Sequence, residues 1–341
     1  MKLMKTEDAV GQVLCHDITQ IIPGVTKDAV FRKGHIIQPE DIPVLLSVGK
    51  DNVYIWENDE TRLHENDAAE VLRAICQGEG MHPGPVKEGK IELIADSDGL
   101  FLADLEGLRA VNSLGEMMIA TRASGFAVKA GDKLAGTRII PLVIEKEKME
   151  RARAAAGPRP LLNVVPMKPK SYGVVTTGNE VFYGRIEDKF TPVLEKKLAE
   201  LGCRMAAHVV LGDDDKAITA AINKMLTDGC EMVLCTGGMS VDPDDRTPLA
   251  IRNTGASIVS YGAPVLPGAM FLVSYMADGR PVCGLPGCIM YSKRTVFDLA
   301  LPRLLADVPI TAEWLAGLGN GGLCLNCQVC SFPNCGFGKG V

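Results

Sequence analysis

The sequence predicts an α/β protein whose main domain is a mostly parallel sheet with helices on both faces, preceded by smaller α+β and β-rich modules. Two observations support this fold class. After residue 170, short apolar strands alternate with helices, which is typical of a largely parallel sheet covered on both faces. Before residue 145, short strands and turns follow one another closely. A chain of 341 residues is long enough for two or three domains with cores of their own.

The first expected module covers residues 1–78 and mixes strands with helices. Residues 13–18 and 53–56 have strand character. Helices are expected over 39–46, which opens with proline and acidic residues, and over 66–75, where Asn66 is a candidate cap. We therefore expect a small α+β unit.

The second expected module, residues 86–144, is rich in short strands. Residues 145–160 are charged and alanine-rich up to the Gly157-Pro158 break, which predicts a helical connector. The strands expected in the second module are 90–95, 99–103, 117–121 and 126–128.

The main domain is expected over residues 161–308, and the remaining residues, 309–341, form a cysteine-rich tail. Within the main domain strands alternate with helices, which predicts a largely parallel sheet covered on both faces. The expected order is strand 172–177, helix 190–201, strand 204–210, helix 215–228 and strand 232–235.

Composition limits the classes of partner. Charged residues are 23% of the chain, and the formal net charge of −6 argues against a general binder of nucleic acid or of a membrane surface. No apolar run approaches the roughly 18 residues that a membrane span needs. The first residues lack the apolar core of a signal peptide, so we expect a cytoplasmic protein.

The central stretch is a short apolar strand that breaks into Gly237-Gly238 and then into an acidic loop. Paired glycines at the end of a buried strand let a ligand approach the backbone closely. Asp242, Asp244 and Asp245 offer the oxygen ligands that Mg²⁺ prefers. A turn whose aspartates cap the following helix explains the same residues without any ligand.

Further glycine-containing loops recur at expected strand ends. In their order and separations they resemble the molybdopterin-binding domain, shared by molybdopterin adenylyltransferases, molybdopterin molybdotransferases and gephyrin-like fusions. The resemblance covers roughly residues 170–308, whereas the first 160 residues match the molybdotransferases poorly. Beside the glycine pair, the loops are Thr177-Gly178-Asn179-Glu180, the 184–188 turn, Pro267-Gly268-Ala269 and Leu285-Pro286-Gly287-Cys288.

This resemblance implies a site for molybdopterin, either as such or in its adenylylated form, and insertion of molybdate or tungstate with release of AMP. Asp245 and Asp244 would be catalytic, with Mg²⁺ held at the acidic loop. Glycine turns and helix starts would hold the phosphate without net positive charge. The implied cofactor-binding residues are Thr177, Gly178, Asn179, Glu180, Gly237, Gly238, Ser240, Asp242, Pro267, Gly268, Pro286, Gly287 and Cys288.

Four positions depart from the family's pattern. Asn179, Phe190, Ala269 and Cys288 stand where the family has Asp, Asn, Lys and Asn. These changes favour an alternative, a non-catalytic carrier or sensor of the cofactor that docks on a molybdoenzyme or a cofactor-synthesis protein. A nucleotide pyrophosphatase-type relative is a third hypothesis. Related domains form dimers or trimers, so a homo-oligomer is expected.

The tail carries the second motif. Cys324, Cys327, Cys330 and Cys335 are spaced for a metal site, and such Cys₄ sets hold either structural Zn²⁺ or a [4Fe–4S] cluster. The two spacings among the first three cysteines match a bacterial ferredoxin run, while the last gap is one residue longer. The other seven of the 11 cysteines are scattered and mostly expected to be small buried apolar residues.

Overall fold

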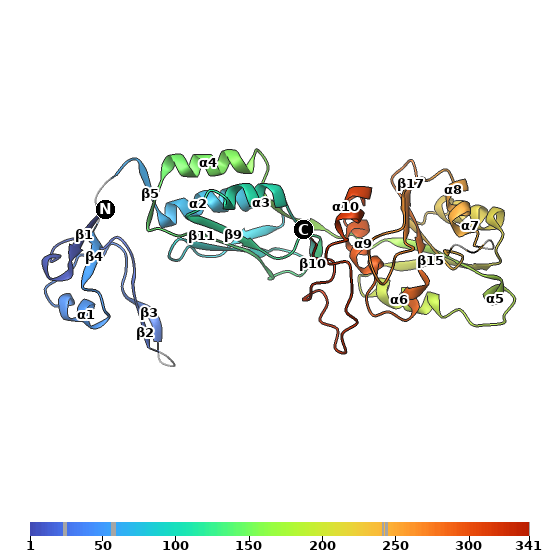
Figure 1. Cartoon of the computed structure of the whole chain (residues 1–341), viewed down its shortest axis with the longest axis horizontal. Coiled ribbons are helices and arrows are strands. Elements are labelled where there is room, and N and C mark those ends of the chain that lie inside the picture. The colour runs from blue at the N-terminus through green and yellow to red at the C-terminus, as the bar shows by residue number, and fades with distance from the viewer. Residues whose placement is uncertain (23–25, 56–58, 241, 243–244, 341) are drawn as a thin grey trace. The chain divides into compact units, whose positions relative to one another are not determined.

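The computed structural model describes residues 1–22, 26–55, 59–240, 242 and 245–340 (Figure 1). The chain divides into two compact units, and the division is not a single cut along the sequence. The first unit contains Met1–Asp96, Ala103–Arg122 and Ala130–Asn163, and the second contains Ser97–Leu102, Ala123–Lys129 and Val164–Val341.

The beginning of the first unit is a small α+β body. Strand β1 (Lys2–Lys5) pairs antiparallel with β4 (Asn52–Ile55), and β2 (Ile18–Ile22) pairs with β3 (Thr26–Phe31). A short 3-10 helix, η1 (Thr6–Asp8), follows β1, and α1 (Asp41–Ser47) precedes β4. A core of Leu14, Ile18, Ile37, Leu45 and Val53 lies between these elements. The expected mixture of strands and helices is found, although residues 13 and 14 form isolated bridges rather than a strand.

The rest of the first unit is built on a four-stranded antiparallel sheet in the order β6-β7-β11-β9. A separate two-stranded antiparallel sheet is formed by β5 (Arg62–His64) and β12 (Val143–Glu145). The sheet strands are β6 (Met81–Pro83), β7 (Lys90–Ala95), β9 (Met117–Thr121) and β11 (Lys133–Ile139), and the helices are α2 (Glu65–Cys76), α3 (Leu105–Asn112) and α4 (Lys146–Ala156).

Two details of this unit differ from the expectation. Helix α3 lies in a stretch expected to hold only strands, and it is started by Asp104, whose carboxylate accepts the Gly107 N–H at 3.0 Å. The cap of α2 is His64 rather than Asn66, because the His64 ring accepts the Asn66 N–H at 3.2 Å. Both helices therefore begin with a side-chain cap.

The second unit contains a six-stranded sheet in the order β15-β14-β16-β19-β18-β17. The first four strands are parallel, and β17 and β18 add an antiparallel edge. A hairpin joins β18 to β19, so these two must run antiparallel. This confirms the mostly parallel α/β sheet. Its strands are β14 (Ser171–Thr177), β15 (Arg204–Leu211), β16 (Met232–Thr236), β17 (Ser257–Tyr261), β18 (Leu272–Tyr275) and β19 (Pro281–Leu285).

Helices cover both faces of this sheet, as predicted. Val174 belongs to the core that includes α6 (Phe190–Ala199) and α9 (Val296–Leu305). The next residue, Val175, belongs to the core that includes α7 (Asp215–Thr227) and α8 (Thr247–Asn253). Neighbouring residues of a strand point to opposite faces, so the two cores lie on opposite sides of the sheet. Helices α7 and α8 lie side by side (Figure 1).

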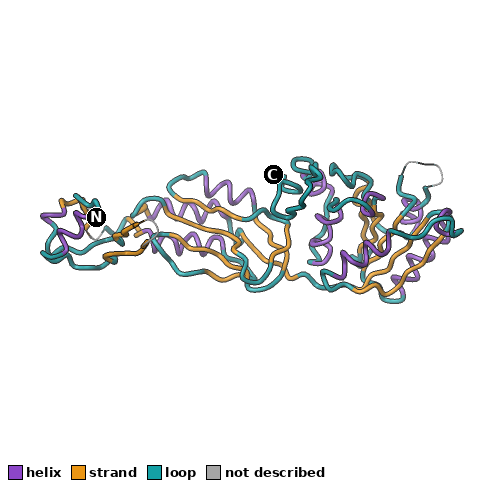
Figure 2. Tube along the Cα trace, turned by 90° about the horizontal axis from the view of Figure 1, so that it is seen from below, coloured by secondary structure: helices purple, strands orange, loops and turns teal. Residues whose placement is uncertain are grey.

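The second unit also holds a three-stranded sheet, β10-β8-β13, from β8 (Gly99–Ala103), β10 (Phe126–Val128) and β13 (Leu162–Pro166). After α10 (Ala312–Gly317) the chain continues as loop to the last described residue (Figure 2). Within the described ranges, no helix is long and apolar enough to cross a membrane.

Candidate functional site

A cavity of about 410 Å³ lies at the carboxyl ends of β16 and β19, the edge of a parallel sheet where ligands bind in α/β proteins. Three loops contribute to it: the glycine-pair loop after β16, the turn before β18 and the turn after β19. Its lining residues are Gly237, Gly238, Met239, Ser240, Asp245, Ala269, Met270, Pro286, Gly287, Cys288 and Tyr291.

Neither Gly237 nor Gly238 can be replaced by another residue unless the loop moves. Gly237 and Gly238 both have positive φ, +81° and +54°. A Cβ on Gly237 would lie 2.1 Å from the Thr177 carbonyl oxygen, and one on Gly238 would lie 2.7 Å from the Thr247 hydroxyl oxygen. The loop after β16 is thus packed directly on the end of β14 and on the start of α8.

Thr177 stabilises this loop through hydrogen bonds of its side chain. Its buried hydroxyl donates to the Thr236 carbonyl at 3.2 Å and is 3.0 Å from the Thr247 hydroxyl. Thr177 does not line the cavity. It joins the ends of two neighbouring strands to the helix behind them.

The acidic loop contributes Asp245 to the cavity wall. Its side chain is half-buried, and its backbone N–H donates to the Asp242 carbonyl at 2.9 Å. Asp242 itself is exposed, and Asp244 lies outside the described residues. Of the described residues that line the cavity, Asp245 is the one that carries a charge.

Tyr261, at the end of β17, ties down the same loop. Its hydroxyl donates to the Met239 carbonyl at 2.7 Å and approaches the Ser240 carbonyl at 3.3 Å. Burial and the negative charge of Asp245 raise the pKa of Tyr261, so its hydroxyl stays protonated and able to donate. No sequence signal marks this tyrosine.

The turn after β19 brings Pro286, Gly287 and Cys288 to the opposite wall, where a short 3-10 helix η2 (Gly287–Met290) begins. The Cys288 thiol is half-buried, and burial raises its pKa. It is therefore a neutral thiol and not an activated thiolate. Tyr291 and Met270 complete the wall, and no sequence signal marked them either.

The remaining predicted binding residues lie away from this cavity's lining. Gly178 precedes the short helix α5 (Asn179–Phe182), where the Asn179 N–H donates to the Asp213 carboxylate at 3.1 Å and Glu180 is exposed. In the 267–269 turn, the Pro267 carbonyl accepts the Val296 N–H at 3.2 Å. A Cβ on Gly268 would lie 2.6 Å from the Val296 side chain, so this turn packs against the start of α9.

The described part of the chain contains no group of three or more His, Cys, Asp or Glu side chains that could hold a metal ion by themselves. For Mg²⁺ the donor set still fits, since this ion commonly takes one or two carboxylates together with substrate phosphates and water. Asp245 is placed to be such a ligand.

The tail cysteines differ from the others in exposure. Cys324 and Cys335 are half-buried, and Cys327 and Cys330 are exposed. Six others are buried, as expected for small apolar residues: Cys15, Cys76, Cys203, Cys230, Cys235 and Cys283.

Comparison with known proteins finds matches for two stretches of the chain. Residues 173–306 match the family described as a probable molybdopterin binding domain, and residues 3–57 match a domain of unknown function (DUF8806).

Among curated proteins, three matches span different lengths. A molybdenum cofactor biosynthesis bifunctional protein of Synechococcus elongatus is 32% identical over 158 residues, which cover 43% of this chain and 48% of that protein. A molybdopterin molybdenumtransferase of the same organism is 26% identical over 180 residues, covering 50% and 42%. A CinA-like protein of Mycobacterium tuberculosis is 35% identical over 88 residues, covering 26% and 20%. The chain spans less than half the length of each of these relatives.

Proposed function

Because residues 173–306 belong to the molybdopterin-binding domain family, we propose that this protein takes part in molybdenum cofactor biosynthesis by binding molybdopterin in the 410 Å³ cavity. The loops predicted from the sequence to hold the pterin supply Gly237, Gly238, Ser240, Pro286 and Gly287 to the wall. The cavity lies at the ligand-binding edge of the sheet.

The main support for a metal-assisted reaction is the negative charge of the cavity lining. The described lining residues include no lysine or arginine, and Asp245 is anionic. A pterin phosphate placed there faces a like charge, which is unfavourable in a partly dehydrated cavity. Asp245 would hold a divalent cation here, whose charge would turn this repulsion into attraction.

In the proposed reaction the substrate is adenylylated molybdopterin, and molybdate or tungstate is the second substrate. A water oxygen attacks the phosphorus on the molybdopterin side, the bond from that phosphorus to the bridging oxygen breaks, and AMP leaves with the bridging oxygen and a proton of the water. Molybdate or tungstate then bonds to the two dithiolene sulfurs, and one of its oxygens leaves as water with the two thiol protons. Mg²⁺ bound at this site would polarise the phosphoryl oxygens. Asp245 would hold that ion, the glycine pair lets the phosphate approach the backbone, and Tyr261 keeps the loop in place.

A carrier of the finished cofactor is the second candidate. Two of the four departures from the family pattern, Ala269 and Cys288, line the cavity, whereas Phe190 is the first residue of α6 and is buried in the core. Ala269 stands in place of the family's cationic lysine, and Cys288 in place of its polar asparagine. A pocket of this kind binds the pterin but stabilises a developing charge less. In that role the tail would dock on a molybdoenzyme or another cofactor-synthesis protein, and the protein would act as a homo-oligomer.

The test is an anaerobic assay of the full chain with adenylylated molybdopterin, Mg²⁺ and molybdate, in which AMP release and pterin binding are followed together. We expect Asp245→Asn to lower AMP release by about 100-fold or more, since a catalytic metal is worth several kcal/mol. It should also remove the Mg²⁺ dependence of pterin binding. The control is Asp228→Asn, an exposed carboxylate at the end of α7 that pairs with Lys224.

The outcomes separate the candidates. Molybdate-dependent AMP release that Asp245→Asn abolishes supports the transferase. Tight pterin binding by the wild type without AMP release supports the carrier. An absence of pterin binding, with hydrolysis of ordinary dinucleotides instead, would overturn both.

A further inference from the structure

The segment that follows α10 is loop throughout, yet it is fixed to the second unit at several points (Figure 2). The Leu266 N–H donates to the Gly322 carbonyl at 2.9 Å, and the Cys324 N–H donates to the Leu266 carbonyl at 2.8 Å. Farther along, Phe337 is buried in the core shared with α9. A loop held at both ends in this way presents its middle, with the cysteines, in a defined place.

All four tail cysteines line one cavity of about 540 Å³. The opposite wall is the loop that leads into α9, with Tyr291, Lys293 and Arg294. Phe332 and Phe337 also line the cavity, with their ring centroids 6.1 Å apart. Cysteines separated by up to 11 positions in the chain therefore surround a common space.

The size of this space bears on which metal group fits. A structural zinc site is closed, with four thiolates about 2.3 Å from a single ion. Among the described residues, these cysteines form no group that could hold a single metal ion. A [4Fe–4S] cluster instead takes one thiolate at each of four irons, so its ligands stand around a multi-atom group.

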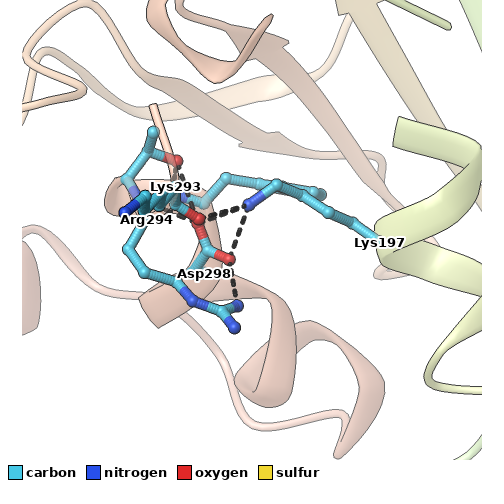
Figure 3. A network of polar contacts seen from close by, with 6 residues as sticks. Lys197, Lys293, Arg294 and Asp298 are labelled. Atoms are coloured by element: carbon cyan, nitrogen blue, oxygen red, sulfur yellow. Dashed lines mark hydrogen bonds and ion pairs between the residues drawn. The ribbon is translucent and has the colours of Figure 1, made fainter. Parts of the chain in front are cut away.

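The charge of the opposite wall suits an anionic group. Asp298 accepts from the Lys197 ammonium at 2.8 and 3.0 Å and from the Arg294 guanidinium at 2.9 Å (Figure 3). Lys293 donates to the Gln328 carbonyl of the tail at 2.9 Å. This network has three cations and one carboxylate, and its surplus positive charge lies beside the thiols. Four thiolates around a cluster carry the opposite charge.

The same network holds the tail in register with the loop. The Arg294 guanidinium lies 4.9 Å from the centre of the Phe332 ring. In the sequence, Phe332 stands between the third and fourth cysteines of the tail. Asp298 also accepts the Thr295 N–H at 2.8 Å in a capping box at the start of α9. Partners of this kind orient the ligands of a metal group.

We propose that Cys324, Cys327, Cys330 and Cys335 bind a [4Fe–4S] cluster in this cavity. Tyr291 lines both this cavity and the 410 Å³ cavity, so the cluster site adjoins the site proposed for the pterin. The cluster proposal depends on the cysteine cavity alone and not on the proposed function.

The test is anaerobic reconstitution of the full chain with ferrous iron and sulfide. We expect about four irons and four sulfides per chain, a visible sulfur-to-iron charge-transfer band, and an electron paramagnetic resonance signal after reduction. Cys327→Ser and Cys330→Ser change exposed residues, so both variants should fold and should lose most of the bound iron. Cys203→Ser, at a buried cysteine outside this cavity, is the matched control and should retain the cluster.

A parallel titration with Zn²⁺ distinguishes the metals. One tightly bound zinc per chain, with no iron–sulfur band after reconstitution, would overturn the cluster in favour of a structural zinc site. Equal iron contents in wild type, Cys327→Ser and Cys330→Ser would overturn the cysteine assignment. The Asp245→Asn variant should bind as much iron and sulfide as the wild type. The cluster result therefore does not depend on whether the proposed transferase activity is found.

Discussion

The close packing of the glycine-pair loop on β14 can be tested with one added methyl group. Gly237 has φ +81°, and its Cβ would lie 2.1 Å from the Thr177 carbonyl oxygen. Gly255, after α8, has nearly the same conformation, φ +84°, with nothing within 4 Å of its Cβ position. Alanine at Gly255 therefore measures backbone strain alone, and alanine at Gly237 measures strain plus the steric conflict.

The expected magnitudes follow from these geometries. A left-handed conformation costs an L-residue about 1–2 kcal/mol, which the lower entropy of the unfolded chain offsets in part. Gly255→Ala should therefore lower the stability of the unit by about 1 kcal/mol. Ordinary contact begins near 3.4 Å, so at Gly237 the loop must open by 3.4 − 2.1 = 1.3 Å against backbone. Such overpacking adds about 1–3 kcal/mol.

Native-state hydrogen exchange at the amides of β14 and β16 measures the opening free energy of this unit without requiring the whole chain to unfold in one step. Gly237→Ala should lower it clearly more than Gly255→Ala, and it should also abolish pterin binding, which Gly255→Ala retains. Losses that agree within about 0.5 kcal/mol would refute the packing argument.

Two further predictions concern charges in the second unit. Asp298→Ala leaves the largely buried Lys197 without its carboxylate and should cost about 3–5 kcal/mol in urea unfolding, with Lys197→Met restoring part of the loss. Asp228→Ala, which breaks an exposed pair with Lys224, should cost only about 0.3–0.5 kcal/mol, and similar costs for the two changes would contradict this reasoning. Burial acts to raise the pKa of Asp188, but hydrogen bonds from the Thr191 hydroxyl and from the N–H groups of Thr191 and Phe190 lower it overall. The carboxylate therefore contributes stability above its unfolded pKa of about 3.9 that is lost as the pH falls through the folded pKa. Asp188→Asn should thus destabilise more at about pH 7 than at about pH 3, and equal losses in urea unfolding at the two pH values would disprove it.

Most strands could be predicted because each is a short apolar run with turn residues at both ends. The ranges 90–95, 117–121 and 126–128 were predicted to the residue. Helix α3 was missed because it is short and its cap, Asp104, is equally typical of a turn between strands. The five-part division of the chain stays a prediction, and the interleaving of 97–102 and 123–129 with the second unit depends on strand pairing that no local pattern encodes.

At the candidate site, the binding residues expected from the sequence stay a prediction, and the structure places some of them in the lining of one cavity and others outside it. Gly237, Asp245 and Cys288 meet in one cavity, whereas Thr177 and Pro267 support the loops from outside its lining. Residues of one loop divide in this way because successive backbone positions face different neighbours, and the twist of the loop decides which of them face the ligand. Tyr261 could not be predicted, since it reaches the glycine-pair loop from an antiparallel edge strand whose pairing is non-local.

By itself, the sequence determined the α/β class, the glycine and acidic loops, and the spacing of the tail cysteines, because each depends on residues close together in the chain. Only the tertiary structure decided that the four cysteines surround a common cavity and that Lys293 and Arg294 face them. It also decided that Tyr291 lies between this cavity and the one proposed for the pterin. The physical reason is that these contacts join the tail to a loop some 30 to 40 positions earlier, and such contacts form only when the core under α9 brings both segments together.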